Sequence, residues 1–250
     1  MPAPTSRPAL RRLRLGLVAA LLVVVLVVIG FLVWANLVMQ GDRARAIDVW
    51  TNERVEVTST EHSVVMSPSG VASGTGLVFI PGAKVDPYAY MYKLSEIVER
   101  TGATVVITKP ILNLAFFDQR PLETFTADAP GVDRWFVGGH SLGGVRACML
   151  ADDPAVSGVV LFGSYCANDL ADSGLEVLSI GGSRDGLSTP EKIADARALL
   201  PADATMVEIE GLNHAGFGDY GVQPGDRTAT ISNDRARDEI TDALATVLVR

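Results

Sequence analysis

From residue 77 onward, short apolar runs rich in β-branched residues alternate with stretches of helical spacing, and this alternation limits the possible folds more than any other feature. Strands joined through helices form a mostly parallel sheet, because a parallel connection must cross the sheet before the next strand begins. The expected strands are 77–80, 104–108, 134–137, 158–162, 176–180 and 205–209. The expected helices are 87–100, 142–151, 190–200 and 234–249. Residues 54–58 and 63–66 precede this pattern and predict an antiparallel hairpin. The predicted fold class is α/β, with a doubly wound sheet covered on both faces.

One turn of this pattern carries a motif for nucleophilic chemistry. Gly139-His140-Ser141-Leu142-Gly143 fits G-x-S-x-G and joins an expected strand to an expected helix. A sharp turn there exposes the serine hydroxyl, and small residues on either side keep the crowded turn free of clashes. The start of the helix adds backbone N–H groups and partial positive charge where an oxyanion would develop. We therefore predict that Ser141 is a nucleophile.

A serine nucleophile needs an imidazole to take its proton, and the chain has only three histidines. His62 lies in the expected hairpin, and His140 is adjacent to Ser141 on a turn that points their side chains apart. His214 follows the last expected strand, at the edge of the sheet where functional groups gather. We predict His214 as the base; the alternative is a solvated loop histidine.

The imidazole in turn needs a carboxylate that fixes its tautomer and stabilises its cation. Asp185 lies in a glycine-bounded loop, GGSRDG, directly after the strand expected at 176–180. We predict Asp185 as this acid. Asp169 and Asp172, after the preceding strand, are alternative acids or else surface loop charges.

Two backbone N–H groups should stabilise the oxyanion, one from the residue after the nucleophile and one from the loop after an earlier strand. The first is Leu142. The turn Pro81-Gly82-Ala83-Lys84 ends the strand expected at 77–80, so the Ala83 N–H is the expected second donor. The Lys84 ammonium is an alternative, although a loop lysine is usually a solvated charge.

Four segments resemble the α/β-hydrolase superfamily, and more narrowly its compact dienelactone-hydrolase-like bacterial branch, over residues 53–250. They are PGAKVDPYAY (81–90), VGGHSLGG (137–144), GGSRDGLSTPEKI (181–193) and GLNHAGFGDYG (211–221). The resemblance implies the α/β-hydrolase fold and a triad of Ser141, Asp185 and His214, with the oxyanion donors named above. The dienelactone hydrolases proper use a cysteine nucleophile, so their substrate is not carried over to this chain. No cofactor and no metal ion is expected.

The intervals between the expected strands are short, which limits what covers the site. Neither 113–131 nor 164–175 has room for a large cap domain, so we expect an open cleft for small or medium esters. Phe116, Phe117 and Tyr165 are candidate substrate-binding walls, with ordinary packing as an equal alternative.

For four further residues the sequence allows more than one role. In the loop 218–230, Asp219 and Asp226 would hold the loop over the site or bind a cation, but plain loop polarity is the simpler interpretation. Cys148 and Cys166 are the only cysteines and match no metal-binding spacing. They form either one disulfide, in an oxidising compartment, or two buried thiols.

Residues 15–35 form an unbroken uncharged run whose length as a helix, about 31 Å, matches the hydrocarbon thickness of a bilayer. The run is longer than the apolar part of most signal peptides, although Val33-Trp34-Ala35 is a weak cleavage site. Arginines precede the run and an acidic chain follows it, so we expect a cytoplasmic N-terminus and a domain outside the cytoplasm. The expected parts are a basic tail (1–14), a membrane signal anchor (15–38), a connector with one helical turn (39–52) and a hydrolase domain (53–250). Cleavage would instead release that domain.

The net charge of the chain argues against nucleic acid as a partner. The formal net charge is −8, and the first fourteen residues contribute four arginines and no acid, which leaves −12 for the rest. Such a body lacks the basic surface of nucleic-acid-binding domains. We therefore expect a small ester as substrate, a membrane as partner and no nucleic acid. The predicted activity is acyl transfer to water. The alternatives are an acyltransferase to a cell-envelope acceptor and a non-catalytic binding module on the same fold.

Overall fold

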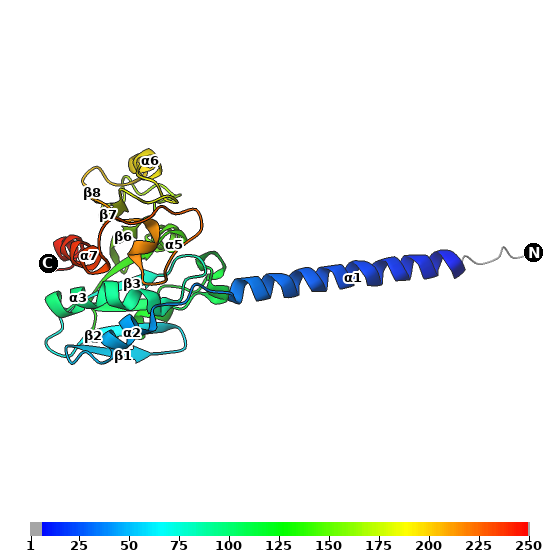
Figure 1. Cartoon of the computed structure of the whole chain (residues 1–250), viewed down its shortest axis with the longest axis horizontal. Coiled ribbons are helices and arrows are strands. Elements are labelled where there is room, and N and C mark those ends of the chain that lie inside the picture. The colour runs from blue at the N-terminus through cyan, green and yellow to red at the C-terminus, as the bar shows by residue number, and fades with distance from the viewer. Residues whose placement is uncertain (1–6, 250) are drawn as a thin grey trace, which may run out of the picture. The chain divides into compact units, whose positions relative to one another are not determined.

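The computed structural model describes residues 7–249, which divide into two compact units at Leu37 and Val38. The first unit contains one helix, α1 (Arg7–Asn36) (Figure 1). Within its segment Leu10–Asn36, an 18-residue window has a mean hydropathy of 3.2, and the segment is long and apolar enough to cross a membrane. A signal sequence has the same length and composition, so the helix agrees with both interpretations of the apolar run.

The second unit is built on one sheet of eight strands in the order β1-β2-β4-β3-β5-β6-β7-β8. In Figure 1 the labelled strands run from β1 and β2 at one edge, through β3, β6 and β7, to β8 at the other. The first two strands form the expected antiparallel hairpin, and β2 is antiparallel to β4. All pairs from β4 to β8 are parallel, as the alternation of strands and helices predicted. The strands are β1 (Val55–Ser59), β2 (Ser63–Pro68), β3 (Thr75–Ile80), β4 (Thr104–Thr108), β5 (Arg134–His140), β6 (Val156–Phe162), β7 (Glu176–Gly182) and β8 (Thr205–Ile209).

The helices follow the predicted order with four local differences, the first being a short helix at 123–126 that was not expected. They are α2 (Arg43–Trp50), α3 (Met91–Thr101), α4 (Glu123–Thr126), α5 (Leu142–Leu150), α6 (Pro190–Asp195) and α7 (Asn233–Leu248). The helix expected at 87–100 begins with a 3-10 turn, η1 (Pro87–Tyr90), which Asp86 caps by accepting from the Tyr88 N–H. The helix expected at 190–200 ends at Asp195, and a separate 3-10 turn, η4 (Arg197–Leu199), follows. The connector holds two turns of helix rather than one, since Asp42 caps α2 by accepting from two backbone N–H groups.

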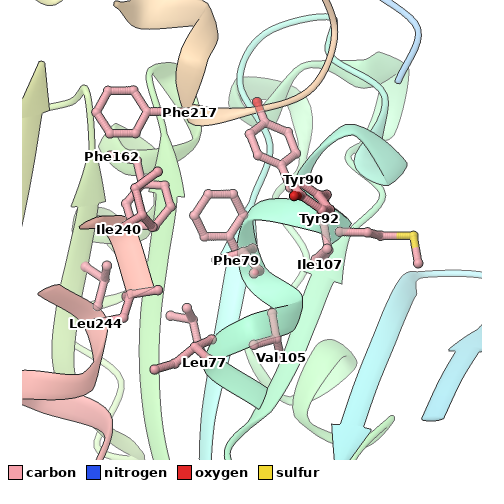
Figure 2. Packing of buried hydrophobic residues seen from close by; sticks show 14 of the residues in the cluster. Leu77, Phe79, Tyr90, Tyr92, Val105, Ile107, Phe162, Phe217, Ile240 and Leu244 are labelled. Atoms are coloured by element: carbon pink, nitrogen blue, oxygen red, sulfur yellow. The ribbon is translucent and has the colours of Figure 1, made fainter. Parts of the chain in front are cut away.

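The sheet has an apolar core on each face, since successive residues of a buried strand point to opposite sides. Leu77 and Phe79 of β3 pack on the face that α3 and α7 cover. Val78 and Ile80 pack on the other face, with α5. Figure 2 shows the first core, where Ile240 and Leu244 of α7 lie beside strand residues.

A row of aromatic rings closes the top of this core below the carboxyl ends of the strands. Phe217, Phe162, Phe79 and Tyr90 follow one another in Figure 2, with neighbouring ring centroids 5.5, 5.0 and 5.1 Å apart. All four side chains are fully buried. Because close-packed interiors resist displacement, this row gives the loops above it a rigid floor.

Cys148 of α5 and Cys166, after β6, form a disulfide with a Cα–Cα distance of 5.6 Å. Of the two interpretations open from the sequence, the structure therefore has the bridge rather than two thiols. It ties the helix behind the candidate nucleophile to the loop that follows the neighbouring strand.

Candidate active site

Ser141 occupies a strained backbone position between β5 and α5, with φ 54° and ψ −123°. Such a conformation costs about 1–3 kcal/mol and persists only where the surroundings enforce it. Here they do, because added Cβ atoms would lie 2.5 Å from the Gly143 carbonyl carbon at Gly139 and 2.0 Å from the Ile80 oxygen at Gly143. The glycines of the motif thus allow the turn to pack directly against the end of β3, and Ser141 stays half-buried at the surface of that turn.

Asp185 and His214 form a buried pair at the ends of β7 and β8. The distance from His214 Nδ1 to Asp185 Oδ2 is 2.7 Å, and neither side chain is exposed. The other carboxylate oxygen, Oδ1, accepts from the N–H groups of Leu187 and Ser188 at 2.8 and 2.7 Å. Because these amides fix the carboxylate, it holds the imidazole with the proton on Nδ1. Asp169, one alternative acid, is exposed and instead accepts from the Ala171 N–H.

The imidazole of His214 lies beside the turn that carries Ser141. The rings of His214 and His140 are 4.4 Å apart, and Ser141 follows His140 directly. Within residues 7–249, His214 Nε2 is buried and has no hydrogen-bond partner, and no hydrogen bond joins it to the Ser141 hydroxyl. In sites without substrate the bond between base and nucleophile is often long and tightens on binding.

His140 joins the turn that carries Ser141 to the loop after β3 through Tyr90. Its Nδ1 lies 2.9 Å from the Tyr90 hydroxyl, which accepts from the Gly82 N–H at 2.9 Å. This arrangement is satisfied when the hydroxyl donates to Nδ1. Burial, with His214 nearby, lowers the pKa of His140 well below its usual range, so its ring stays neutral. Sequence reasoning considered His140 only as a rival base and missed Tyr90, since nothing local indicates a contact fifty residues away.

The two expected oxyanion donors lie on segments that touch. The Gly143 position packs against the Ile80 and Pro81 carbonyls, which brings the start of α5 onto the loop that contains Ala83. In the part of the chain that the structure describes, neither the Ala83 nor the Leu142 N–H donates a hydrogen bond. The alternative donor, Lys84, has φ 58° and is held by its backbone N–H, which donates to Asn113 at 2.8 Å.

Asp226 bonds the backbone of both loops that carry the buried pair. Its Oδ1 accepts from Gly186, His214 and Arg227 N–H groups at 2.9, 3.2 and 2.8 Å, and its Oδ2 accepts from Ala215 at 2.8 Å. Plain loop polarity, the simpler interpretation from the sequence, is therefore wrong for this residue. The carboxylate fastens the residue after Asp185 to the backbone of His214.

Asp219 has a different role. It forms a buried ion pair with Lys93 at 3.1 Å, and its backbone N–H donates to Ala89 at 2.7 Å. These bonds fix the start of the loop 218–230 against α3 and η1, so plain polarity is wrong here as well. Among the described residues, no group of three or more His, Cys, Asp or Glu side chains is arranged to hold a metal ion.

The predicted wall residues lie in separate places. Phe116 is 68% exposed and lines a depression of about 50 Å³ together with Leu142 and Met149. Phe117, 43% exposed, packs edge-on against Phe116. Tyr165 lines a different depression, beside Cys166 and α6. A larger cavity of about 610 Å³ lies along the loop that contains Asp219 and Asp226, and Ser141 is not among its lining residues.

Comparison with known proteins decides the family. A family model described as "Alpha/beta hydrolase family" matches residues 76–238. The chain belongs to this family. The fold class and the superfamily predicted from the sequence are thus confirmed, and the family assignment supports the predicted hydrolase activity. A search of the curated proteins found no match.

Solved alpha/beta hydrolases share this fold at low sequence identity. An esterase from Pyrobaculum calidifontis has a TM-score of 0.57 at 15% identity, covering 83% of this chain and 91% of its own. The esterase domain of a Rhodothermus marinus protein has a TM-score of 0.54 at 13% identity, covering 77% and 96%. A membrane phospholipase A, described as a bacterial virulence factor, has a TM-score of 0.54 at 16% identity, covering 95% and 99%.

Proposed function

We propose that this alpha/beta hydrolase is a serine esterase in which Ser141 is the nucleophile, His214 the base and Asp185 the acid. The observation that carries the proposal is the buried Asp185–His214 pair at 2.7 Å, whose imidazole lies beside the Ser141 turn and whose remaining nitrogen has no partner among the described residues. A buried imidazole held in one tautomer with its other nitrogen free is suited to take a proton.

The proposed reaction has two halves. His214 Nε2 takes the hydroxyl proton while Ser141 Oγ attacks the ester carbonyl, and the Ala83 and Leu142 N–H groups stabilise the oxyanion. The ester C–O bond then breaks, His214 returns the proton to the leaving alcohol, and an acyl-serine remains. Water, deprotonated by the same imidazole, attacks the acyl-serine and releases the acid with the proton restored to Ser141. Asp185 stabilises the imidazolium in both halves.

The neutral state of His140 supports this assignment electrostatically. A second positive ring 4.4 Å from His214 would oppose formation of the imidazolium on which both halves of the reaction depend. Because burial keeps His140 uncharged, its ring supports the turn without that penalty.

We also propose that the enzyme is exported and held in the membrane by α1, with its N-terminus in the cytoplasm. The apolar stretch of α1 and the basic residues before it favour this topology. The Cys148–Cys166 disulfide gives independent support, because such bonds persist in oxidising compartments outside the cytoplasm. The dienelactone-hydrolase-like branch, with serine in place of cysteine, remains our narrower family proposal.

The test is covalent labelling of the full-length protein in detergent with a fluorophosphonate probe. We expect labelling of the native chain and none of Ser141→Ala. We also expect His214→Ala to lower ester hydrolysis by roughly 10⁴-fold or more. His62→Ala is the matched control, since His62 bonds Arg120 away from the buried pair and its loss should leave the rate near native.

Folded native protein that resists the probe would favour a binding module and end the enzyme proposal. Ester products that carry an added alcohol instead of water would identify an acyltransferase using the same residues.

A further inference from the structure

The chain enters the folded body on the loop that carries a proposed oxyanion donor. Met39 forms a parallel bridge with Val85, in which its N–H donates to Lys84 at 2.7 Å and its carbonyl accepts from Asp86 at 3.0 Å. Lys84 directly follows Ala83. Met39 is thereby fixed on the segment that forms one side of the candidate site.

The apolar helix ends close to this point in the chain. α1 ends at Asn36, and only Leu37 and Val38 separate it from Met39. Three residue steps reach at most about 11 Å, whatever their conformation. The polar headgroup layer on each side of a bilayer is about 5–8 Å thick. If α1 spans a membrane, the loop bearing Ala83 must therefore stay at the membrane surface.

Several exposed apolar side chains lie on the side of the site formed by the loop that bears Ala83. We call this set the apolar rim: Ile111, Phe116, Phe117 and Met149, which are 46, 68, 43 and 52% exposed. The segment 111–117 is joined to the loop bearing Ala83 by the hydrogen bond from the Lys84 N–H to the Asn113 carbonyl. Phe116 and Met149 also line one depression with Leu142, the residue after the nucleophile. A cluster of large exposed apolar groups beside a catalytic residue marks a surface that meets another apolar phase.

We propose that the apolar rim inserts into the interface of the membrane that α1 spans, and that the site takes its acyl ester from a lipid of that membrane. The proposal rests on the esterase function and names its substrate class. Aromatic residues favour the headgroup level, and the short tether keeps the loop joined to the rim at the membrane surface. The lipid ester C–O bond breaks as the bond from Ser141 Oγ to the acyl carbon forms. The lipid alcohol leaves with the serine proton, and water then releases the fatty acid.

The test compares two substrates in full-length protein reconstituted into vesicles of phosphatidylethanolamine and phosphatidylglycerol. One rate is fatty-acid release from the vesicle lipids, measured by mass spectrometry. The other is hydrolysis of p-nitrophenyl acetate, which reaches the site from water. The ratio of the lipid rate to the acetate rate reports how the site meets the membrane, and it cancels any general loss of active enzyme.

Two insertions of equal length between Asn36 and Leu37 vary the tether. Four EAAAK repeats would extend the helix by about 30 Å and hold the loop away from the surface, whereas twenty Gly/Ser residues let the body return to it. We expect the helical insert to lower the ratio at least tenfold and the flexible insert to lower it less than threefold. Ile111→Ser combined with Met149→Ser should lower the ratio at least fivefold with the native tether.

An unchanged ratio in both the helical-insert protein and the rim variant would overturn the proposal. Acetate hydrolysis by the native chain without release of fatty acid from vesicles would also overturn it, while leaving the esterase function intact. If the native chain neither hydrolyses p-nitrophenyl acetate nor reacts with the fluorophosphonate probe, both proposals are refuted together.

Discussion

Removing the Asp226 carboxylate should damage catalysis without touching a reacting atom. Asp226→Ala leaves three amides of neighbouring loops, those of Gly186, His214 and Ala215, without their acceptor. A hydrogen bond to a charged group contributes about 1.5–3 kcal/mol when fully protected. Asp226 is half-buried, so water replaces part of each bond and about 1 kcal/mol apiece is the better figure, or about 3 kcal/mol in total.

The stability change and the catalytic change are separable. A loss of about 3 kcal/mol corresponds to a decrease in Tm of roughly 6–12 °C for a domain of this size. Below that temperature the protein stays folded, but the loops bearing Asp185 and His214 are no longer fastened to each other. A displacement of the proposed base, His214, by about 1 Å costs on the order of 100-fold in rate. We therefore expect kcat at 25 °C to fall about 100-fold with KM changed less than threefold.

Asp226→Asn should have an intermediate effect on stability and on kcat. Its amide oxygen can replace Oδ1 and keep three bonds, but its NH₂ group would then face the Ala215 N–H, so we expect a loss between those of native and Asp226→Ala. Asp153→Ala is the matched control. Asp153 likewise accepts a backbone N–H, from Ala155 at 2.9 Å, in the turn before β6 at the opposite end of the strand from the site.

The assays are thermal unfolding and steady-state ester hydrolysis on the same full-length preparations. A variant with the expected decrease in Tm but native kcat at 25 °C would show that Asp226 only stabilises the loop. Native Tm together with native kcat would refute the reasoning altogether, because the four hydrogen bonds would then contribute nothing.

Three further predictions concern the surroundings of the site. Tyr90→Phe removes the hydroxyl that joins Gly82 to His140, so we expect about 1–3 kcal/mol less stability and roughly tenfold lower kcat, checked by denaturant unfolding and kinetics. The folded state holds His140 neutral, whereas the unfolded chain binds a proton on this residue below about pH 6.5. The free energy of unfolding should therefore fall by about 2 kcal/mol between pH 7.5 and 5, and His140→Gln should flatten its dependence on pH. Reducing the Cys148–Cys166 disulfide, which closes a loop with a sequence separation of 18, should lower the free energy of unfolding by about 3 kcal/mol. In a double Cys→Ser variant the reductant should leave the free energy of unfolding unchanged.

Sequence reasoning succeeded where the signal was local. The strand pattern located every strand of the sheet within three residues at each end, because alternation and β-branched content are properties of short windows. The G-x-S-x-G turn was also readable, since its glycines reflect close packing at that very turn. The residue proposed as base followed from elimination among three histidines, which needs only the count and the order of elements.

What the sequence did not reveal lies in contacts between distant segments. Asp226 bonds Gly186 across 40 positions, and Tyr90 reaches His140 across 50. Neither contact leaves a periodic trace, because each depends on where two loops meet above the sheet. The sequence could not decide between a disulfide and two thiols for the same reason, since spacing along the chain does not give the distance between Cys148 and Cys166.

The sequence alone therefore determined the fold class, the apolar helix and the order in which the chemical groups follow the strands. Parallel strands place their carboxyl ends at one edge, so this order already predicted that the groups would lie near one another. Only the tertiary structure decided which of them touch: Asp185 with His214, Asp226 with both of their loops, and Met39 with the loop beside Ala83. The physical reason is that hydrogen bonds form over about 3 Å, a precision that loop packing sets and that one-dimensional patterns do not encode.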